Sequence, residues 1–269
     1  MGKIAAAYIE SRPGDVFFNL RGILNILQKM KDKEVDFVLL PELCLSGYIS
    51  SEDEINAVLN DKEKAFEHLK EFSKKNKPAF AFGFPEKIKE SIYISHYLIV
   101  KGEIVGIHRK THLGCTEKEI YDEENMLKVF NIDKLTVGMQ LCFETHFPEL
   151  SAIQAKMGAN VLAMAFASPK EAENTKLERF KRFLCARAYD NSCYLLACNL
   201  AGETSKGANL PGLAMIIDPK GNVIAEEVKS SAGYCLAEFD TNALQHIYQS
   251  KMAHFNEFKR YEILKDFYE

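Results

Sequence analysis

The stretch Val137-Gly-Met-Gln-Leu-Cys-Phe-Glu-Thr-His-Phe-Pro-Glu149 predicts the kind of fold that this chain adopts. An apolar strand over residues 136–141 runs directly into Cys142, and Pro148 suits the first turn of a helix that follows. Short apolar strands and amphipathic helices alternate in this way along most of the chain. Such alternation is typical of the α/β class.

Helices are predicted where apolar residues recur at spacings of three and four, over residues 16–30, 65–72, 150–157 and 177–188. Apolar runs predict strands over residues 4–9, 37–40, 79–82, 92–100, 104–107, 136–141, 161–165, 193–198, 213–217 and 234–239. We expect Gly83 and Pro85 to end the strand over 79–82. Because many strands are apolar on both faces, helices or a second sheet must cover them. Periodicity alone does not choose between a doubly wound sheet and a two-sheet sandwich.

Composition places the chain among single-domain globular proteins. With 269 residues it can bury about 73% of its extended surface, enough for a core without disulfides or metals. We expect one domain over residues 1–269, with a core over 1–240 and a tail over 241–269. The net charge of −4 argues against a nucleic-acid partner, and no run of 18 apolar residues predicts a membrane span. Seven scattered cysteines without a signal peptide indicate reduced thiols in the cytoplasm.

Several common motifs are absent from the sequence. Without GxSxG or GxGxxG, neither a serine-hydrolase elbow nor a dinucleotide site is predicted, and we expect no cofactor. His108, His112 and Cys115 come nearest to a metal-ligand pattern. Gly114 favours a loop there and no fourth ligand is evident, so no metal site is predicted.

Three polar residues of complementary chemistry, Glu42, Lys110 and Cys142, follow predicted strands. Active sites of open α/β folds gather at the carboxyl ends of strands, so these side chains could lie together. The ammonium would lower the pKa of the thiol, and the carboxylate would accept its proton. The thiolate would attack a carbonyl or nitrile carbon, while Lys110 and the N–H of Phe143 hold the developing charge. Water would then hydrolyse the covalent intermediate.

Three ordered motifs carry a family resemblance. They are P-E-x-x-x-x-G-Y over residues 41–48, R-K-T-H-L over 109–113 and C-x-E-x-x-F-P-E-L over 142–150. In this order they resemble the nitrilase, or carbon-nitrogen hydrolase, superfamily and its amidase-like branch. The resemblance extends over essentially the whole chain, because residues 4–20 and 185–202 are similar to other segments of that family.

The resemblance implies a four-layer α-β-β-α sandwich and a Glu-Lys-Cys triad. In that family's scheme Glu42 would be the general base, Lys110 the oxyanion stabiliser and Cys142 the nucleophile. Many members use a further glutamate, which the pattern places at Glu117, with Glu119 as the competing assignment. The sequence departs from the family over residues 121–125, where Tyr-Asp-Glu-Glu-Asn replaces an aromatic residue followed by Pro-Gly.

Four further residues are candidates for the pocket: Phe143, Glu144, Tyr48 and Asn199. Alternation places Glu144 on the same side as Cys142, where it would either line the pocket or bond to backbone or an arginine such as Arg187. Asn199 ends a strand and would either face the pocket or cap a turn. In the family the loop over residues 166–174 lines the pocket, and here it carries Lys170, Glu171 and Glu173.

The expected function is thiol-dependent hydrolysis of a small-molecule amide or carbamoyl compound. Nitrilases carry C-W-E at the nucleophile, whereas this chain has C-F-E and no tryptophan, so a nitrile is the less favoured substrate. Acyl transfer to an amine through the same triad, and a ligand-binding or scaffold protein on the same fold, remain alternatives.

The tail is rich in aromatic residues, which predicts a docking surface. They are Tyr248, Phe255, Phe258, Tyr261, Phe267 and Tyr268. Family members place a C-terminal tail across a dimer interface, so a homodimer is expected. The alternative is a helix packed on its own domain.

Overall fold

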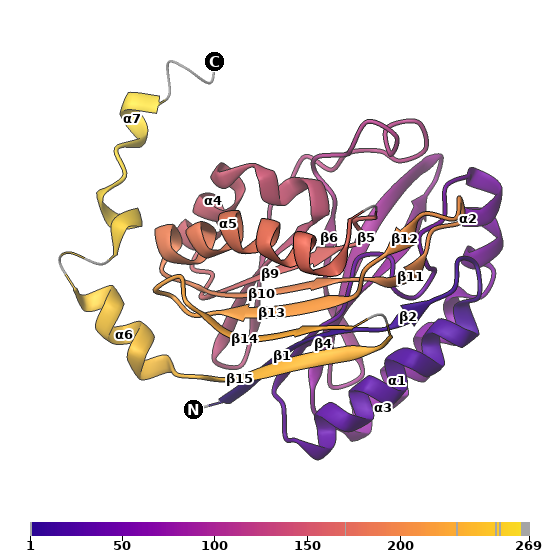
Figure 1. Cartoon of the computed structure of the whole chain (residues 1–269), viewed down its shortest axis with the longest axis horizontal. Helices are drawn as coiled ribbons and strands as arrows, with labels where there is room; N and C mark the ends of the chain where they lie inside the picture. Colours follow the sequence, from indigo (N-terminus) through magenta and orange to yellow (C-terminus); the bar gives the residue numbers. More distant parts are fainter. Residues whose placement is uncertain (1, 170, 230, 251, 253, 265–269) are drawn as a thin grey trace.

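Two six-stranded sheets face each other in a computed structural model of the chain (Figure 1). The structure describes residues 2–169, 171–229, 231–250, 252 and 254–264. The first sheet has the strand order β15-β1-β3-β4-β5-β6. Its strands are β1 (Gly2–Tyr8), β3 (Phe37–Leu39), β4 (Ala79–Ile88), β5 (Ser91–Val100), β6 (Glu103–Arg109) and β15 (Gly233–Phe239).

The second sheet has the order β14-β13-β10-β9-β8-β7. Its strands are β7 (Val129–Ile132), β8 (Leu135–Leu141), β9 (Val161–Phe166), β10 (Tyr194–Asn199), β13 (Leu213–Ile217) and β14 (Val223–Val228). A small third sheet joins β2 (Glu10–Ser11), β11 (Ala201–Glu203) and β12 (Asn209–Leu210).

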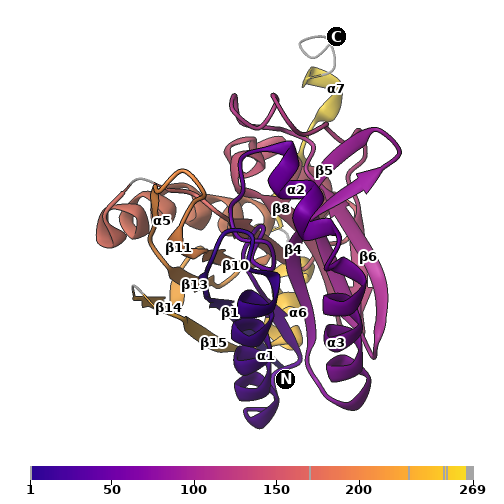
Figure 2. The ribbon, with the colours of Figure 1, turned by 90° about the vertical axis from the view of Figure 1, so that its right-hand side faces the viewer.

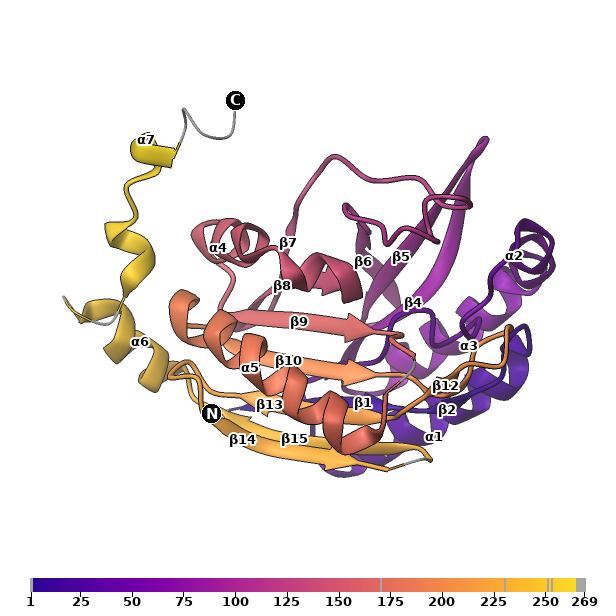
Figure 3. The same cartoon turned by 45° about the horizontal axis from the view of Figure 1, so that its top comes forward.

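Helices cover the outer face of each large sheet, which gives four layers (Figures 2 and 3). The helices α1 (Val16–Asp32) and α3 (Lys62–Lys75) lie on the first sheet, and α2 (Glu52–Leu59) precedes α3. The helices α4 (Pro148–Lys156) and α5 (Glu173–Asn191) lie on the second. Inner-face residues of both sheets, such as Val38, Val137 and Ala163, share one buried core. The predicted α-β-β-α sandwich is therefore confirmed.

Strand directions bring the carboxyl ends of the key strands to one edge. The strands β1, β3 and β4 are parallel, and so are β8, β9 and β10. The strand β5 runs antiparallel to β4, and β6 runs antiparallel to β5, so β6 points the same way as β4. Residues that follow β3, β6, β8 and β9 therefore meet at the same end of the sandwich.

The predicted end of the strand over 79–82 is wrong, because β4 continues through Gly83 and Pro85 to Ile88. The strand β3 pairs only with residues 79–81, so from Phe82 onward β5 is the only strand paired with β4, and on the other side the Leu45 N–H of a loop donates to the Gly83 carbonyl at 3.1 Å. A proline is tolerated where no strand pairs on one side. At Gly83 a Cβ atom would lie 2.1 Å from the Leu43 nitrogen, so glycine allows β4 to approach the segment that follows Glu42.

The tail forms α6 (Thr241–Gln249), the 3₁₀ turn η2 (Phe255–Phe258) and α7 (Tyr261–Leu264). The ring centroid of Phe255 lies 5.4 Å from that of Tyr189 on α5, so this part of the tail packs on its own domain. Phe258 and Met252 are 63% and 82% exposed. Phe267 and Tyr268 lie outside the described residues. Within the described ranges, no helix is both long and apolar enough to cross a bilayer.

Candidate active site

The three residues at the strand ends come from both sheets. Glu42 follows β3, Lys110 follows β6, and Cys142 follows β8 as the first residue of the 3₁₀ turn η1 (Cys142–His146). The side chains of Glu42 and Lys110 are wholly buried. Cys142 has a φ of 41°, a left-handed conformation that costs energy in a non-glycine residue and recurs at functional sites.

Lys110 lies between two carboxylates. Its Nζ donates to Glu42 Oε1 at 2.8 Å and to Glu117 Oε1 at 2.9 Å. Burial favours the neutral amine, but these two carboxylates hold the pKa of Lys110 well above the ordinary value of a lysine. Glu117 Oε2 also accepts from the Gly114 N–H at 2.7 Å. Glu119, the competing residue in the sequence, is exposed and makes none of these contacts.

Each carboxylate oxygen of Glu42 accepts one hydrogen bond, Oε1 from Lys110. Its Oε2 accepts from the Ala167 N–H at 3.1 Å, just beyond the end of β9. Burial raises the pKa of Glu42 to about 7, with Lys110 opposing and the nearby charge of Glu117 adding to the rise. A carboxyl group with that pKa can both accept and return a proton near neutral pH.

Cys142 is a neutral thiol in the resting site. Burial, followed by the carboxylate of Glu42, raises the pKa of Cys142 to about 12, while Lys110 and the Ala167 N–H pull the pKa down. A thiol with that pKa is almost entirely protonated at neutral pH, so it becomes a nucleophile only when a base removes its proton.

Glu144 does not serve as a pocket residue in this structure. Its carboxylate is wholly buried and accepts from the N–H and Oγ1 of Thr111 at 2.8 and 2.6 Å, and from the Leu141 N–H at 2.6 Å. It also contacts His108 Nε2 at 2.8 Å. Against the effect of burial, His108 and Thr111 lower the pKa of Glu144. Glu144 thus ties the residue after Lys110 to the residue before Cys142, and the bond to Arg187 is not formed.

Asn199 is also a structural clamp and not a pocket residue. Its Oδ1 accepts from the Ser168 N–H at 2.8 Å, and its Nδ2 donates to the carbonyls of Ser168, Leu200 and Pro211 at 3.2, 3.1 and 2.7 Å. Because the side chain is wholly buried, the amide joins three loop segments. Phe143 is 39% exposed and packs its ring against Phe147, with a centroid distance of 5.5 Å.

A cavity of about 350 Å³ lies beside the Lys110 cluster. Glu117 and Tyr48 line it, together with other residues from segments 48–50, 116–121, 204–208 and Pro169. Tyr121 also lines it, and the buried Tyr121 hydroxyl has no hydrogen-bond partner among the described residues. Burial raises the pKa of Tyr121, so this hydroxyl stays protonated and keeps an unused O–H donor. No pattern in the sequence indicated this role for Tyr121, which stands beside Asp122 and Glu123.

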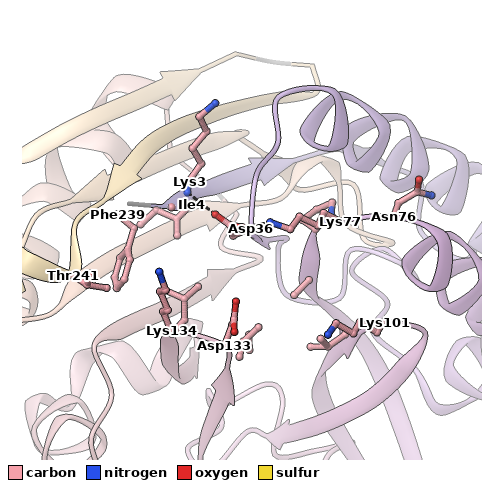
Figure 4. Close-up of a pocket in the computed structure, with 16 residues that line it drawn as sticks. Lys3, Ile4, Asp36, Asn76, Lys77, Lys101, Asp133, Lys134, Phe239 and Thr241 are labelled. Atoms are coloured by element: carbon pink, nitrogen blue, oxygen red, sulfur yellow. Dashed lines mark hydrogen bonds and ion pairs between the residues drawn. The ribbon is translucent and has the colours of Figure 1, made fainter.

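A second cavity, of about 400 Å³, lies at the opposite end of the sandwich (Figure 4). Lys3, Asp36, Lys77, Lys101 and Lys134 are among the residues that line it. These residues stand at the amino ends of β1, β3, β4 and β8 or at the β5–β6 turn. The cavity is therefore separate from the Cys142 edge.

His108, His112 and Cys115, which come nearest to a metal-ligand pattern in the sequence, do not form a metal site. His108 is buried and contacts Glu144, whereas Cys115 is exposed. Across the part of the chain that the structure describes, no group of three or more His, Cys, Asp or Glu residues could hold a metal ion. The seven cysteines are all unpaired.

Residues 3–249 match the profile of the Carbon-nitrogen hydrolase family. The chain therefore belongs to the carbon-nitrogen hydrolases, enzymes that hydrolyse carbon–nitrogen bonds. The fold agrees with this family: a solved amidase from Nesterenkonia sp. AN1 superimposes with a TM-score of 0.85 at 20% identity, covering 99% of this chain and all of that one.

Two curated relatives are similar over most of their length. A 2-oxoglutaramate amidase from Bacillus subtilis is 30% identical over 229 residues, which cover 82% of this chain and 84% of the relative. A probable nitrilase from Schizosaccharomyces pombe is 27% identical over 255 residues, covering 91% and 92% of the two chains.

Proposed function

We propose that this protein hydrolyses the C–N bond of a small amide or carbamoyl compound through a thioester on Cys142. The observation that carries the proposal is the buried ammonium of Lys110, held by Glu42 and Glu117 at the edge where Cys142 begins its turn. The cluster provides a thiol, a base and a fixed positive charge, which acyl transfer to a thiol requires.

The first step is deprotonation of Cys142 as it attacks the substrate carbonyl. The thiol is protonated at rest, and Glu42 is the carboxylate whose pKa of about 7 suits it to accept the proton. The S–C bond forms while the carbonyl oxygen becomes an oxyanion. Lys110 Nζ and the Phe143 N–H are the donors for that oxyanion, and one such donor contributes about 3 to 4 kcal/mol in a transition state.

The C–N bond then breaks, and Glu42 returns its proton to the leaving nitrogen. Ammonia or an amine departs and the acyl group remains on Cys142 as a thioester. Water attacks this thioester, Glu42 accepts the proton of the water, and the acid is released with the thiol restored. Throughout, Glu117 holds Lys110 in place from the side that faces the cavity.

The cavity favours a small polar substrate. A volume of about 350 Å³ lined by Tyr48, Tyr121 and Thr204 offers hydroxyl groups beside an apolar wall that includes Ile49 and Ile120. Because one relative is a 2-oxoglutaramate amidase, 2-oxoglutaramate is the first amide to test, followed by carbamoyl amines, simple amides and nitriles. Added amine acceptor would divert the product from free acid if acyl transfer were the true reaction.

Cys142→Ala should abolish ammonia release from the amide that the wild type turns over fastest, with the circular dichroism spectrum unchanged. The variant lacks the sulfur on which the thioester forms. Cys115→Ala is the matched control, because Cys115 is exposed, and it should retain wild-type turnover. Undiminished ammonia release by Cys142→Ala would exclude the thioester mechanism.

The dependence of kcat/KM on pH should report the protonation of Glu42. Below about pH 7 the carboxyl group is protonated and cannot accept the thiol proton, so kcat/KM should fall on the acid side. Glu117→Gln removes a carboxylate that raises the pKa of Glu42, so the acid limb should move to lower pH even if the maximal rate falls. Glu119→Gln should leave the limb in place. A limb that moves with Glu119 and not with Glu117 would reverse the assignment.

We also propose that the exposed side of the tail is covered by a second copy of the chain. Phe255 packs on α5, but Met252 and Phe258 stay largely exposed and lie on the same segment. Light scattering at micromolar concentration should give the mass of a dimer, and Phe258→Ser should reduce it. A monomeric wild-type mass would rule out this interface.

The proposed role of Cys142 also favours a location for the protein. A working thiol must stay reduced, which favours a reducing compartment, the cytoplasm.

A further inference from the structure

A lysine that no sequence pattern singled out is buried beside the candidate active site. Lys176 stands in the first turn of α5, yet its side chain is wholly buried. Its Nζ donates to Ser168 O at 2.5 Å, to Ser168 Oγ at 2.9 Å and to Pro169 O at 3.1 Å. A lysine ammonium has three N–H groups, so these three oxygens use all of them.

The ammonium of Lys176 has no carboxylate within hydrogen-bond distance among the described residues. Its nearest carboxylate oxygen, Glu171 Oε2, lies 3.7 Å away, and that carboxylate is held by Arg179 at 2.8 Å. Removing an ammonium from water costs several kcal/mol unless its contacts compensate. The compensation at Lys176 comes from the oxygens of Ser168 and Pro169, together with the charge of Glu171.

The same segment supplies a donor to the two reacting groups. The Ala167 N–H donates to Glu42 Oε2 at 3.1 Å, and it lowers the pKa of both Glu42 and Cys142. Asn199 holds Ser168 from the β10 side, and Lys176 holds it from the α5 side. The position of the Ala167 N–H therefore depends on two buried side chains.

We propose that Lys176 is a positioning residue: by holding Ser168 and Pro169 it keeps the Ala167 N–H against the carboxylate of Glu42 and the thiol of Cys142. The inference rests on the proposed roles of Glu42 as base and Cys142 as nucleophile. Lys176 itself touches neither the substrate cavity nor the reacting atoms.

The charges around Lys176 make this role dependent on pH. Burial lowers the pKa of Lys176 to about 8; the carboxylate of Glu171 opposes that change, and the charge of Arg179 adds to it. Once the ammonium loses its proton, two N–H groups remain for three oxygens, so one contact to the segment is lost. The alkaline side of the activity profile should therefore contain a decline near pH 8 that belongs to Lys176.

The test compares Lys176→Met with Lys181→Met, the same change on a partly exposed, ion-paired lysine of α5. The rate at which iodoacetamide alkylates Cys142, followed by peptide mass spectrometry, is measured from pH 6 to 10. Lys176→Met should slow it at pH 8 by about tenfold, because misplaced groups lose rate steeply. With the best amide, kcat should fall by a similar factor while KM changes little, and the decline near pH 8 should disappear. Lys181→Met should match the wild type in each measurement.

The proposal would be overturned if Lys176→Met kept the wild-type rate of Cys142 alkylation and the wild-type kcat. A decline of activity near pH 8 that persists in the variant would overturn it as well. If Lys176→Met fails to fold, Lys176→Gln keeps a polar donor at the site and carries the same expectation. Alkylation does not need the natural substrate. Slower alkylation in the variant, together with a wild type that hydrolyses no amide, would therefore support the positioning role and contradict the proposed function.

Discussion

The ion pairs of Lys110 with Glu42 and Glu117 are the interaction on which the rest of the site depends. One buried ammonium faces two carboxylates, so the cluster carries more acid than base. Burial, with the nearby charge of Glu117 adding to it, raises the pKa of Glu42 to about 7, and the two carboxylates keep Lys110 charged against the effect of burial. The base and the oxyanion-binding cation of the proposed mechanism therefore come from the same three side chains. Removing either carboxylate would change both properties together.

Holding that cluster requires buried polar residues with no direct part in the chemistry. Glu144 joins the segment of Lys110 to that of Cys142, and Asn199 joins the segment after β9 to the neighbouring loops. Each side chain is wholly buried; Asn199 bonds to backbone groups, and Glu144 bonds to backbone N–H groups as well as to Thr111 Oγ1 and His108. A buried polar network of this kind stabilises one arrangement when all its members are satisfied. The precision of the site thus comes from loops clamped at the ends of rigid strands.

The sequence predicted most of the elements and singled out Glu42, Lys110 and Cys142, because those signals are local. A strand that ends in a thiol, a carboxylate or an ammonium is visible in a few consecutive residues. The pairing of strands into two sheets is not local, which is why only the family resemblance pointed to a sandwich. The helix α2 was missed because it buries only Ile55 and Val58, too short a stripe to stand out. The extension of β4 past Pro85 depends on where β3 stops.

The direction of individual side chains was the other feature that the sequence did not predict. Alternation placed Glu144 beside Cys142, but the 3₁₀ turn after β8 changes the direction of the chain, and its carboxylate bonds backward to Leu141. Lys176 had no signal, since a lysine in the first turn of a helix is normally solvated, and here the segment before α5 folds over it. Both positions depend on contacts between segments distant in sequence, which no spacing within one segment encodes.

The most direct test of this account is the mass of the enzyme during turnover. A reaction with a good amide substrate, quenched in acid within the first turnover, should show protein heavier by the acyl group of that substrate. Peptide mapping should place the added mass on Cys142. An adduct on another residue, or ammonia release from an enzyme whose mass never changes, would contradict the thioester mechanism that the Lys110 cluster is proposed to support.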